Sequence, residues 1–264
     1  MSSPALPVTH FLNIPLTSGN APDAARAFRA AVLSSPWAAG CGIDAEMFVE
    51  PGHLHLSLGS LKLYSNERRR RATQAVDEVG AAVRAILSED IGGGGQIMAG
   101  IQGLQGSAKA GSGVASHSSA TASSAPPGQS QGAVAGANSK TDAVYVLVEE
   151  LGLTAEVGGG NKGRLVRVCQ AVADIFGGAG LLHESGGGGA MTLRATLIDP
   201  GLRSTTFVAR SGADIFDARR VLAEHAGLDC GTGSLEALHL STFGEFDVNL
   251  GGYFRCLAQC PLHL

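Results

Sequence analysis

Hydrophobic and polar residues alternate or recur at regular spacings in several segments, and these patterns predict the secondary structure. Positions 53–58 alternate strictly, which predicts a half-buried strand within residues 52–63. Apolar residues from Val76 to Ile86 recur at spacings of three and four, which predicts an amphipathic helix capped by Asn66. Further strands are predicted over 7–16, 96–105, 144–148, 180–184, 190–198, 204–209 and 234–243, and further helices over 20–33, 163–176 and 214–225.

Strands and helices follow in a similar order in the two halves of the chain, which predicts an α+β fold built by internal pseudo-duplication. Between the halves, residues 106–140 consist of Gly, Ser, Ala and other small or polar residues with two lysines. Such a segment cannot bury a core. We therefore expect one domain over residues 1–264 with a disordered insertion at 106–140; a boundary between two independent domains is the alternative.

The composition excludes some classes of protein but does not identify the class of this chain. The 264 residues are 44% hydrophobic and carry a formal net charge of −4, so any attraction for nucleic acid must be local. The five cysteines lack the spacing of a zinc site, and we expect no metal or other cofactor. Because we find neither a signal peptide nor a membrane-spanning run, we expect a location in the nucleus and/or cytoplasm without a membrane partner. We also expect the chain to be a monomer.

The strand that contains GHLHLSLG carries the first candidate for chemistry. Its leucines lie on one face, whereas His53, His55 and Ser57 lie on the other. A neutral imidazole accepts a proton near pH 7, and a hydroxyl two residues away hydrogen-bonds a phosphoryl oxygen. The pair His55 and Ser57 therefore fits phosphoester chemistry. The alternative is a solvent-facing strand with incidental polar residues.

The strand that contains MTLRATLI repeats this pattern in the second half. Arg194 and Thr196 share one face, and the apolar residues share the other. Arginine stands where the first strand has histidine. Its pKa above about 12 prevents it from acting as a base, but its guanidinium can bind a phosphate. Taken by itself, this pattern equally describes an arginine exposed at a sheet edge.

The two short motifs HLS (55–57) and RAT (194–196) resemble the paired H-x-T/S motifs of the two-histidine (2H) phosphoesterases. The chain is most similar to the subgroup that contains A-kinase anchor protein 7 and the activating signal cointegrator 1 complex subunit 1, the latter being the closer match. The similarity extends over nearly the whole chain outside the insertion and the glycine runs. The segments that carry it are THFLNIPL (9–16), GIDAEMF (42–48), LHLSLGSLKL (54–63), MAGIQGL (98–104), GRLVRV (163–168), TLRATLI (192–198), FDARRVL (216–222) and SLEALHLSTFGEFD (234–247).

This resemblance implies a bilobal fold in which two antiparallel sheets with flanking helices form a concave cleft. It implies catalytic roles for His55, Ser57 and Thr196 and a substrate-binding role for Arg194, which replaces the second catalytic histidine. The implied substrates are RNA-end or cyclic nucleotide phosphodiesters. Two functions stay open: a metal-independent phosphodiesterase, or a catalytically degenerate interaction subunit of a transcription-coactivator or DNA-repair complex, with a helicase or coactivator as its partner.

A further H-x-S pair, His239 and Ser241, lies in the predicted strand 234–243. If this strand borders the cleft, the pair binds substrate and His239 supplies the missing proton donor; the alternative is a structural histidine. Two other features have similar alternatives. His10 either lines the cleft or packs in the core, and the basic run 68–71 is either a nucleic-acid patch or a solvated helix face.

Overall fold

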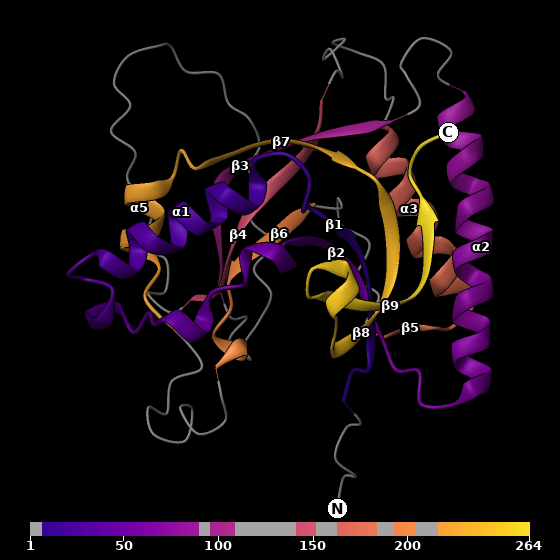
Figure 1. Ribbon diagram of the computed structural model, residues 1–264, viewed down its shortest axis with the longest axis horizontal. Coiled ribbons are helices and arrows are strands. Elements are labelled where there is room, and N and C mark those ends of the chain that lie inside the picture. Colours follow the sequence, from indigo (N-terminus) through magenta and orange to yellow (C-terminus); the bar gives the residue numbers. More distant parts are fainter. Residues whose placement is uncertain (1–6, 90–95, 109–140, 152–162, 184–192, 204–215) are drawn as a thin grey trace, which may run out of the picture.

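The computed structural model describes residues 7–89, 96–108, 141–151, 163–183, 193–203 and 216–264 (Figure 1). The strands among them form one curved antiparallel sheet in the order β7-β3-β4-β6-β2-β1-β8-β9, with β5 paired to β2. Their bounds are β1 His10–Pro15, β2 His55–Leu61, β3 Ile97–Ala108, β4 Thr141–Glu150, β5 Leu182–His183, β6 Arg194–Ile198, β7 Asp229–Leu235, β8 Ala237–Asp247 and β9 Tyr253–Pro261.

The two strands that carry the short motifs, β2 and β6, lie side by side in the middle of this sheet. They share one paired position, Leu56 opposite Ala195. The other end of β2 pairs with β5, at Ser60 and Leu61. The segment before β2 also bonds β6, through the bridge between Phe48 and Ile198 and the hydrogen bond from the Val49 amide to the Leu197 carbonyl. The described strands thus form one curved sheet, and the two-sheet, bilobal arrangement that the resemblance implies stays a prediction.

The helices pack at the two sides of the sheet. Helix α2 (Asn66–Ser88) lies beside α3 (Arg164–Gly178), whereas α1 (Ala21–Ser34) packs on β7 and α5 (Arg219–His225) on β3 (Figure 1). Helix α2 begins after Ser65, whose hydroxyl accepts a hydrogen bond from the Arg68 amide, so Ser65 and not Asn66 is its N-cap. Among the described residues, no helix is long and apolar enough to cross a membrane.

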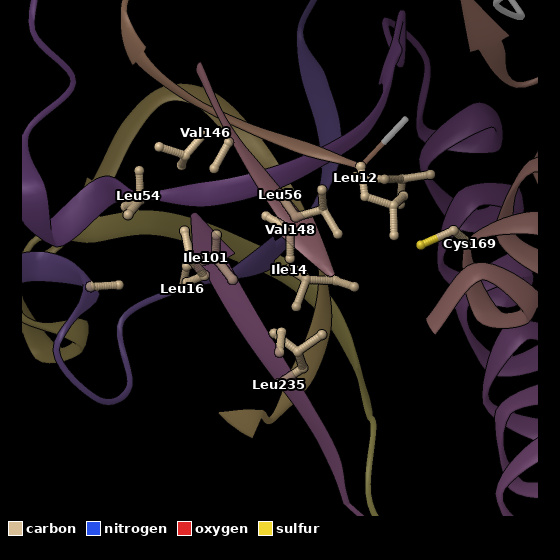
Figure 2. Packing of buried hydrophobic residues seen from close by; sticks show 14 of the residues in the cluster. Leu12, Ile14, Leu16, Leu54, Leu56, Ile101, Val146, Val148, Cys169 and Leu235 are labelled. Carbon is tan, nitrogen blue, oxygen red and sulfur yellow. The ribbon is translucent and has the colours of Figure 1, made fainter. Parts of the chain in front are cut away.

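Alternating apolar residues of the central strands form the core, together with the inner faces of the helices. Leu12, Ile14 and Leu56 are fully buried and lie near Val146 and Val148 of β4 (Figure 2). Because side chains alternate along a strand, the residues between these positions face the opposite side of the sheet. That opposite side carries Phe11, His55, Ser57 and Thr196.

The α+β class is confirmed, and most predicted elements are present with shifted ends. At the C-terminal end, the strand expected at 234–243 is divided between β7 and β8, and β9 was not predicted. Strand β3 continues to Ala108, so 106–108 belong to the sheet. The strand expected at 204–209 and residues 109–140 of the expected insertion lie outside the described residues.

Candidate functional site

A cavity of about 850 Å³, here called the main cavity, opens on the polar side of the sheet where β1, β2, β6, β8 and β9 converge. His55, Ser57 and Thr196 line it together, so the structure brings the three predicted catalytic residues into one place. Its other lining residues are Val8, Phe11, Arg29, Ala45, Glu46, Phe48, Val49, Glu50, His53, Ser60, Asp199, Leu202, Phe243, Gly244, Phe246 and Phe254.

His55 is held in one orientation at the start of β2. Its Nδ1 lies 2.7 Å from the carbonyl oxygen of His53, and because a carbonyl only accepts, Nδ1 carries the proton of the neutral ring. Nε2 is then the unprotonated nitrogen. The rings of Phe11 and Phe254 lie 5.2 and 5.6 Å from the imidazole. Burial lowers the pKa of His55 below its usual 6.5, which favours the neutral, proton-accepting form at pH 7.

The hydroxyls of Ser57 and Thr196 lie on the same side of the sheet as His55. The antiparallel pairing of Leu56 with Ala195 places His55 next to Thr196 and Ser57 next to Arg194. Side chains that face each other across antiparallel strands are about 4.5–5.5 Å apart at Cβ. One phosphoryl group between β2 and β6 can therefore meet the imidazole and both hydroxyls.

Arg194 shares this face but does not line the main cavity. Its side chain is exposed, and its guanidinium carbon lies 4.8 Å from the centre of the Tyr145 ring on the neighbouring strand β4. Among the described residues, no carboxylate forms a salt bridge with Arg194. The arginine is therefore held by a cation–π contact, one strand away from the centre of the cavity.

His239 and Ser241 do not line the main cavity either. Ser241 is fully buried and accepts a hydrogen bond of 2.9 Å from the amide of Asn13, whose oxygen accepts one of 2.7 Å from Tyr253. The Tyr253 ring lies 5.9 Å from that of His239. Burial lowers the pKa of His239, and its Nδ1 is buried without a hydrogen-bond partner in the described part of the chain. The pair is thus packed against Tyr253 and is not brought to His55.

The site also has an aromatic part that no sequence motif indicated. Five phenylalanines line the main cavity, contributed by β1, β8, β9 and the residue after the short helix η2 (Ala45–Met47). His53, at the end of η3 (Pro51–His53), stacks on Phe246 at 4.8 Å and donates from Nε2 to the carbonyl of Gly252. The phenylalanine spacing on β8, at 243 and 246, does not follow strand alternation. No local pattern therefore identified these residues.

The end of the cavity near α1 carries charge of both signs. Arg29 forms a salt bridge of 2.7 Å with Glu50, and Glu46 and Asp199 lie nearby in the lining. These carboxylates repel an anion, whereas the histidine end has no acidic lining residue. In the part of the chain that the structure describes, no group of three His, Cys, Asp or Glu side chains is placed to hold a metal ion.

The remaining candidates of the sequence lie elsewhere. His10 is buried and lines a second, smaller cavity of about 210 Å³ together with Arg69 and Arg255, so it does not line the main cavity. In the basic run, Arg68 and Arg71 donate to the carbonyls of Gly180 and Ala179 at the end of α3. These two arginines therefore help to hold α3 beside α2.

Comparison with known proteins gives the family of the chain. Residues 8–262 match the family model described as the AKAP7 2'5' RNA ligase-like domain, and the chain belongs to that family. A solved structure described as "Crystal structure of phosphoesterase" is similar at 11% identity, covering 98% of this chain and 100% of its own, with a TM-score of 0.48. No curated protein matches the chain. The closer resemblance to the cointegrator subunit stays a prediction.

Proposed function

We propose that the main cavity binds RNA-end or cyclic nucleotide phosphodiesters and that the chain hydrolyses them slowly, with His55 as its one proton-transfer group. The observation that carries this proposal is the setting of His55. Its Nδ1 is anchored to the His53 carbonyl, its Nε2 is free of that bond, and its lowered pKa keeps it neutral at pH 7. This is the state that a general base requires.

The charges of the cavity support one orientation of the substrate. The carboxylates of Glu46, Glu50 and Asp199 disfavour a phosphate at their end, so the phosphate lies between β2 and β6. There the hydroxyls of Ser57 and Thr196 donate to its oxygens, and the sugar and base extend along the phenylalanines. His55 takes a proton from a water molecule, the water oxygen attacks phosphorus, and the ester bond to the ribose oxygen breaks, with the departing oxygen taking a proton from solvent water to become a hydroxyl.

We expect slow hydrolysis because β6 carries no second histidine. The leaving ribose oxygen needs a proton, and a guanidinium with a pKa above about 12 is a very poor donor. Losing one general acid or base costs roughly 10²–10⁴ in rate.

Arg194 also favours a second candidate, a module that binds nucleotide phosphates without turning them over inside a transcription-coactivator or DNA-repair assembly. A helicase or coactivator partner, a monomeric state and a nuclear or cytoplasmic location belong to this proposal and were inferred from the sequence alone.

Hydrolysis of a short RNA that ends in a 2′,3′-cyclic phosphate tests the first candidate. We expect slow release of a monoester by the parent protein and a loss of roughly 10²–10⁴-fold in His55→Ala. His263→Ala is the matched control, because that histidine is exposed and lies away from the cavity; it keeps the parent rate.

Three results would contradict the proposal or replace it. A His55→Ala protein as active as the parent removes His55 from the chemistry. Binding without any hydrolysis by the parent favours the non-catalytic module. Absence of both binding and hydrolysis overturns the assignment of the cavity.

A further inference from the structure

We infer that Arg194, resting on Tyr145, holds the phosphate next to the reacting one and not the reacting phosphate itself. This inference rests on the proposed function, because it takes His55, Ser57 and Thr196 as the place of the reacting phosphate. A catalytic group at position 194 would contact the reacting phosphate, whereas Arg194 is assigned to the neighbouring phosphate.

The guanidinium of Arg194 lies away from the place of the reacting phosphate. The backbone of Arg194 lies across from Ser57, but its side chain extends toward β4 and ends over the Tyr145 ring, 4.8 Å from its centre. Neighbouring strands are about 4.7–4.9 Å apart. The positive charge is thus displaced by about one strand from the cavity, a step comparable to that between successive phosphates of a nucleotide chain.

The positive charge of Arg194 is available to a ligand. The Arg194 side chain is exposed, and among the described residues its contact is with an aromatic face and not with an acid. A stacked guanidinium keeps its N–H groups in the plane of the fork, where they can bind an oxyanion through two parallel hydrogen bonds. By contrast, Arg29, Arg203 and Arg255 each form a salt bridge with a carboxylate.

The opposite side of the cavity carries exposed aromatic rings. Phe243 and Phe246 are 62% and 52% exposed although both line the cavity. Exposed aromatic rings beside a site are surfaces on which bases of single-stranded RNA stack. Stacking there, the reacting phosphate at His55 and a further phosphate at Arg194 form one continuous path across β8, β2 and β6.

Equilibrium binding of two ligands of different length tests the inference. The ligands are uridine 3′-monophosphate and a tetrauridylate that ends in a 3′-phosphate, neither of which presents the cyclic ester to His55. The parent protein is expected to bind the tetranucleotide at least tenfold more tightly, since one added charge-assisted contact of about 1.4 kcal/mol alone gives roughly tenfold. In Arg194→Gln this preference for the tetranucleotide falls roughly tenfold below that of the parent, and any part of it due to base stacking remains.

The salt dependence gives a readout that a structural role for Arg194 would not change. The logarithm of the affinity for the tetranucleotide falls linearly with the logarithm of the salt concentration. In Arg194→Gln this slope is expected to be shallower by about 0.7, the value for one phosphate contact to a single strand. Arg194→Lys keeps the charge and most of the slope. Arg26→Gln, which removes an exposed arginine of α1, keeps both the slope and the preference of the parent.

The outcomes separate this inference from the proposed function. If the parent binds both ligands equally, or if Arg194→Gln keeps the preference of the parent, the inference is wrong and the proposed function stands. If Arg194→Gln weakens both ligands by the same factor, Arg194 contacts the reacting phosphate and the inference is again wrong. If the parent binds neither ligand, the proposed function fails with it.

Discussion

Strands β2 and β6 carry the same alternation and meet at Leu56 and Ala195, yet their polar side chains have different surroundings. His55 lies between Phe11 and Phe254 with Nδ1 bonded to a carbonyl, whereas Arg194 lies exposed on Tyr145. Both strands turn the same positions toward the cavity side. The comparison shows that strand periodicity decides which face a residue occupies, and that the neighbouring strands decide what the residue can do there.

The largest effect is expected on the free energy of unfolding, when a residue on the core face of β2 or β6 is replaced. The two strands do not differ on this face. Leu56 and Leu197 are both buried in the core, at 0% and 3% exposure. Replacing either by alanine removes apolar contacts and leaves a cavity, which costs about 2–5 kcal/mol in the free energy of unfolding. Urea unfolding followed by circular dichroism measures this cost. Leu257→Ala is the control, since that leucine of β9 is exposed and costs much less.

Unequal costs would change the comparison. If Leu56→Ala destabilises the protein and Leu197→Ala does not, the core faces of β2 and β6 also differ, and the similarity of the strands ends with their sequence pattern.

The next largest effect is expected on the rate of hydrolysis, when a residue on the cavity face of β6 is replaced. Arg194→His gives β6 the same histidine and hydroxyl pair as β2. With a second imidazole able to donate a proton to the leaving oxygen, we expect hydrolysis of the cyclic phosphate to increase by roughly 10²-fold. Steady-state rates measure the gain, and Arg194→Gln is the control that removes the arginine without adding a titrating group. Equal rates for these two variants would show that position 194 is too far from the reacting phosphate.

The smallest effect is on the pH dependence of stability. Burial lowers the pKa of His55 below 6.5, so the unfolded chain binds more protons than the folded chain between that lowered pKa and pH 6.5. The contribution of the neutral ring is therefore complete above pH 6.5 and is lost as the pH falls toward the folded pKa. Burial lowers the pKa of His10 and His239 in the same direction.

Melting temperatures measured between about pH 7.5 and pH 5 test this pH dependence, with one substitution on β2 and one on β6. His55→Gln removes one of the three contributions and makes the decrease toward acid pH shallower. Arg194→Gln keeps the decrease of the parent, because the arginine does not titrate in this range. A His55→Gln protein with the full decrease would mean that His55 titrates alike in the folded and unfolded chain.

The sequence was informative wherever a property depends on near neighbours in the chain. The alternation at 53–58 correctly placed Leu56 in the core and His55 with Ser57 on the opposite face. The spacing from Val76 to Ile86 likewise predicted the buried side of α2. Both follow from the periods of strand and helix alone.

Other features depend on distant segments and could not be predicted in the same way. His239 and Ser241 have the same H-x-S pattern as His55 and Ser57, but Tyr253 and Asn13 cover them. Strand β9 was not predicted although its burial alternates regularly from Phe254 to Pro261, because the sequence hides this alternation: the inner face carries the small Ala258 and the outer face carries the apolar Leu257. Whether an H-x-S pair faces a cavity thus depends on which strand folds over it.

The single paired position between β2 and β6 has a mechanical consequence. Strand β3 pairs with β4 along nearly its whole length, whereas β2 itself pairs with β6 at Leu56 and Ala195 among the described residues, with β5 on the other end of the β2 edge. The segment before β2 adds a second attachment to β6, because Phe48 bridges Ile198, the Val49 amide donates to the Leu197 carbonyl and the Asp199 amide donates to the Met47 carbonyl. A force that pulls the two halves of the sheet apart is therefore shared between the pair at Leu56 and this segment, so the residues before His55 help to keep it beside Thr196.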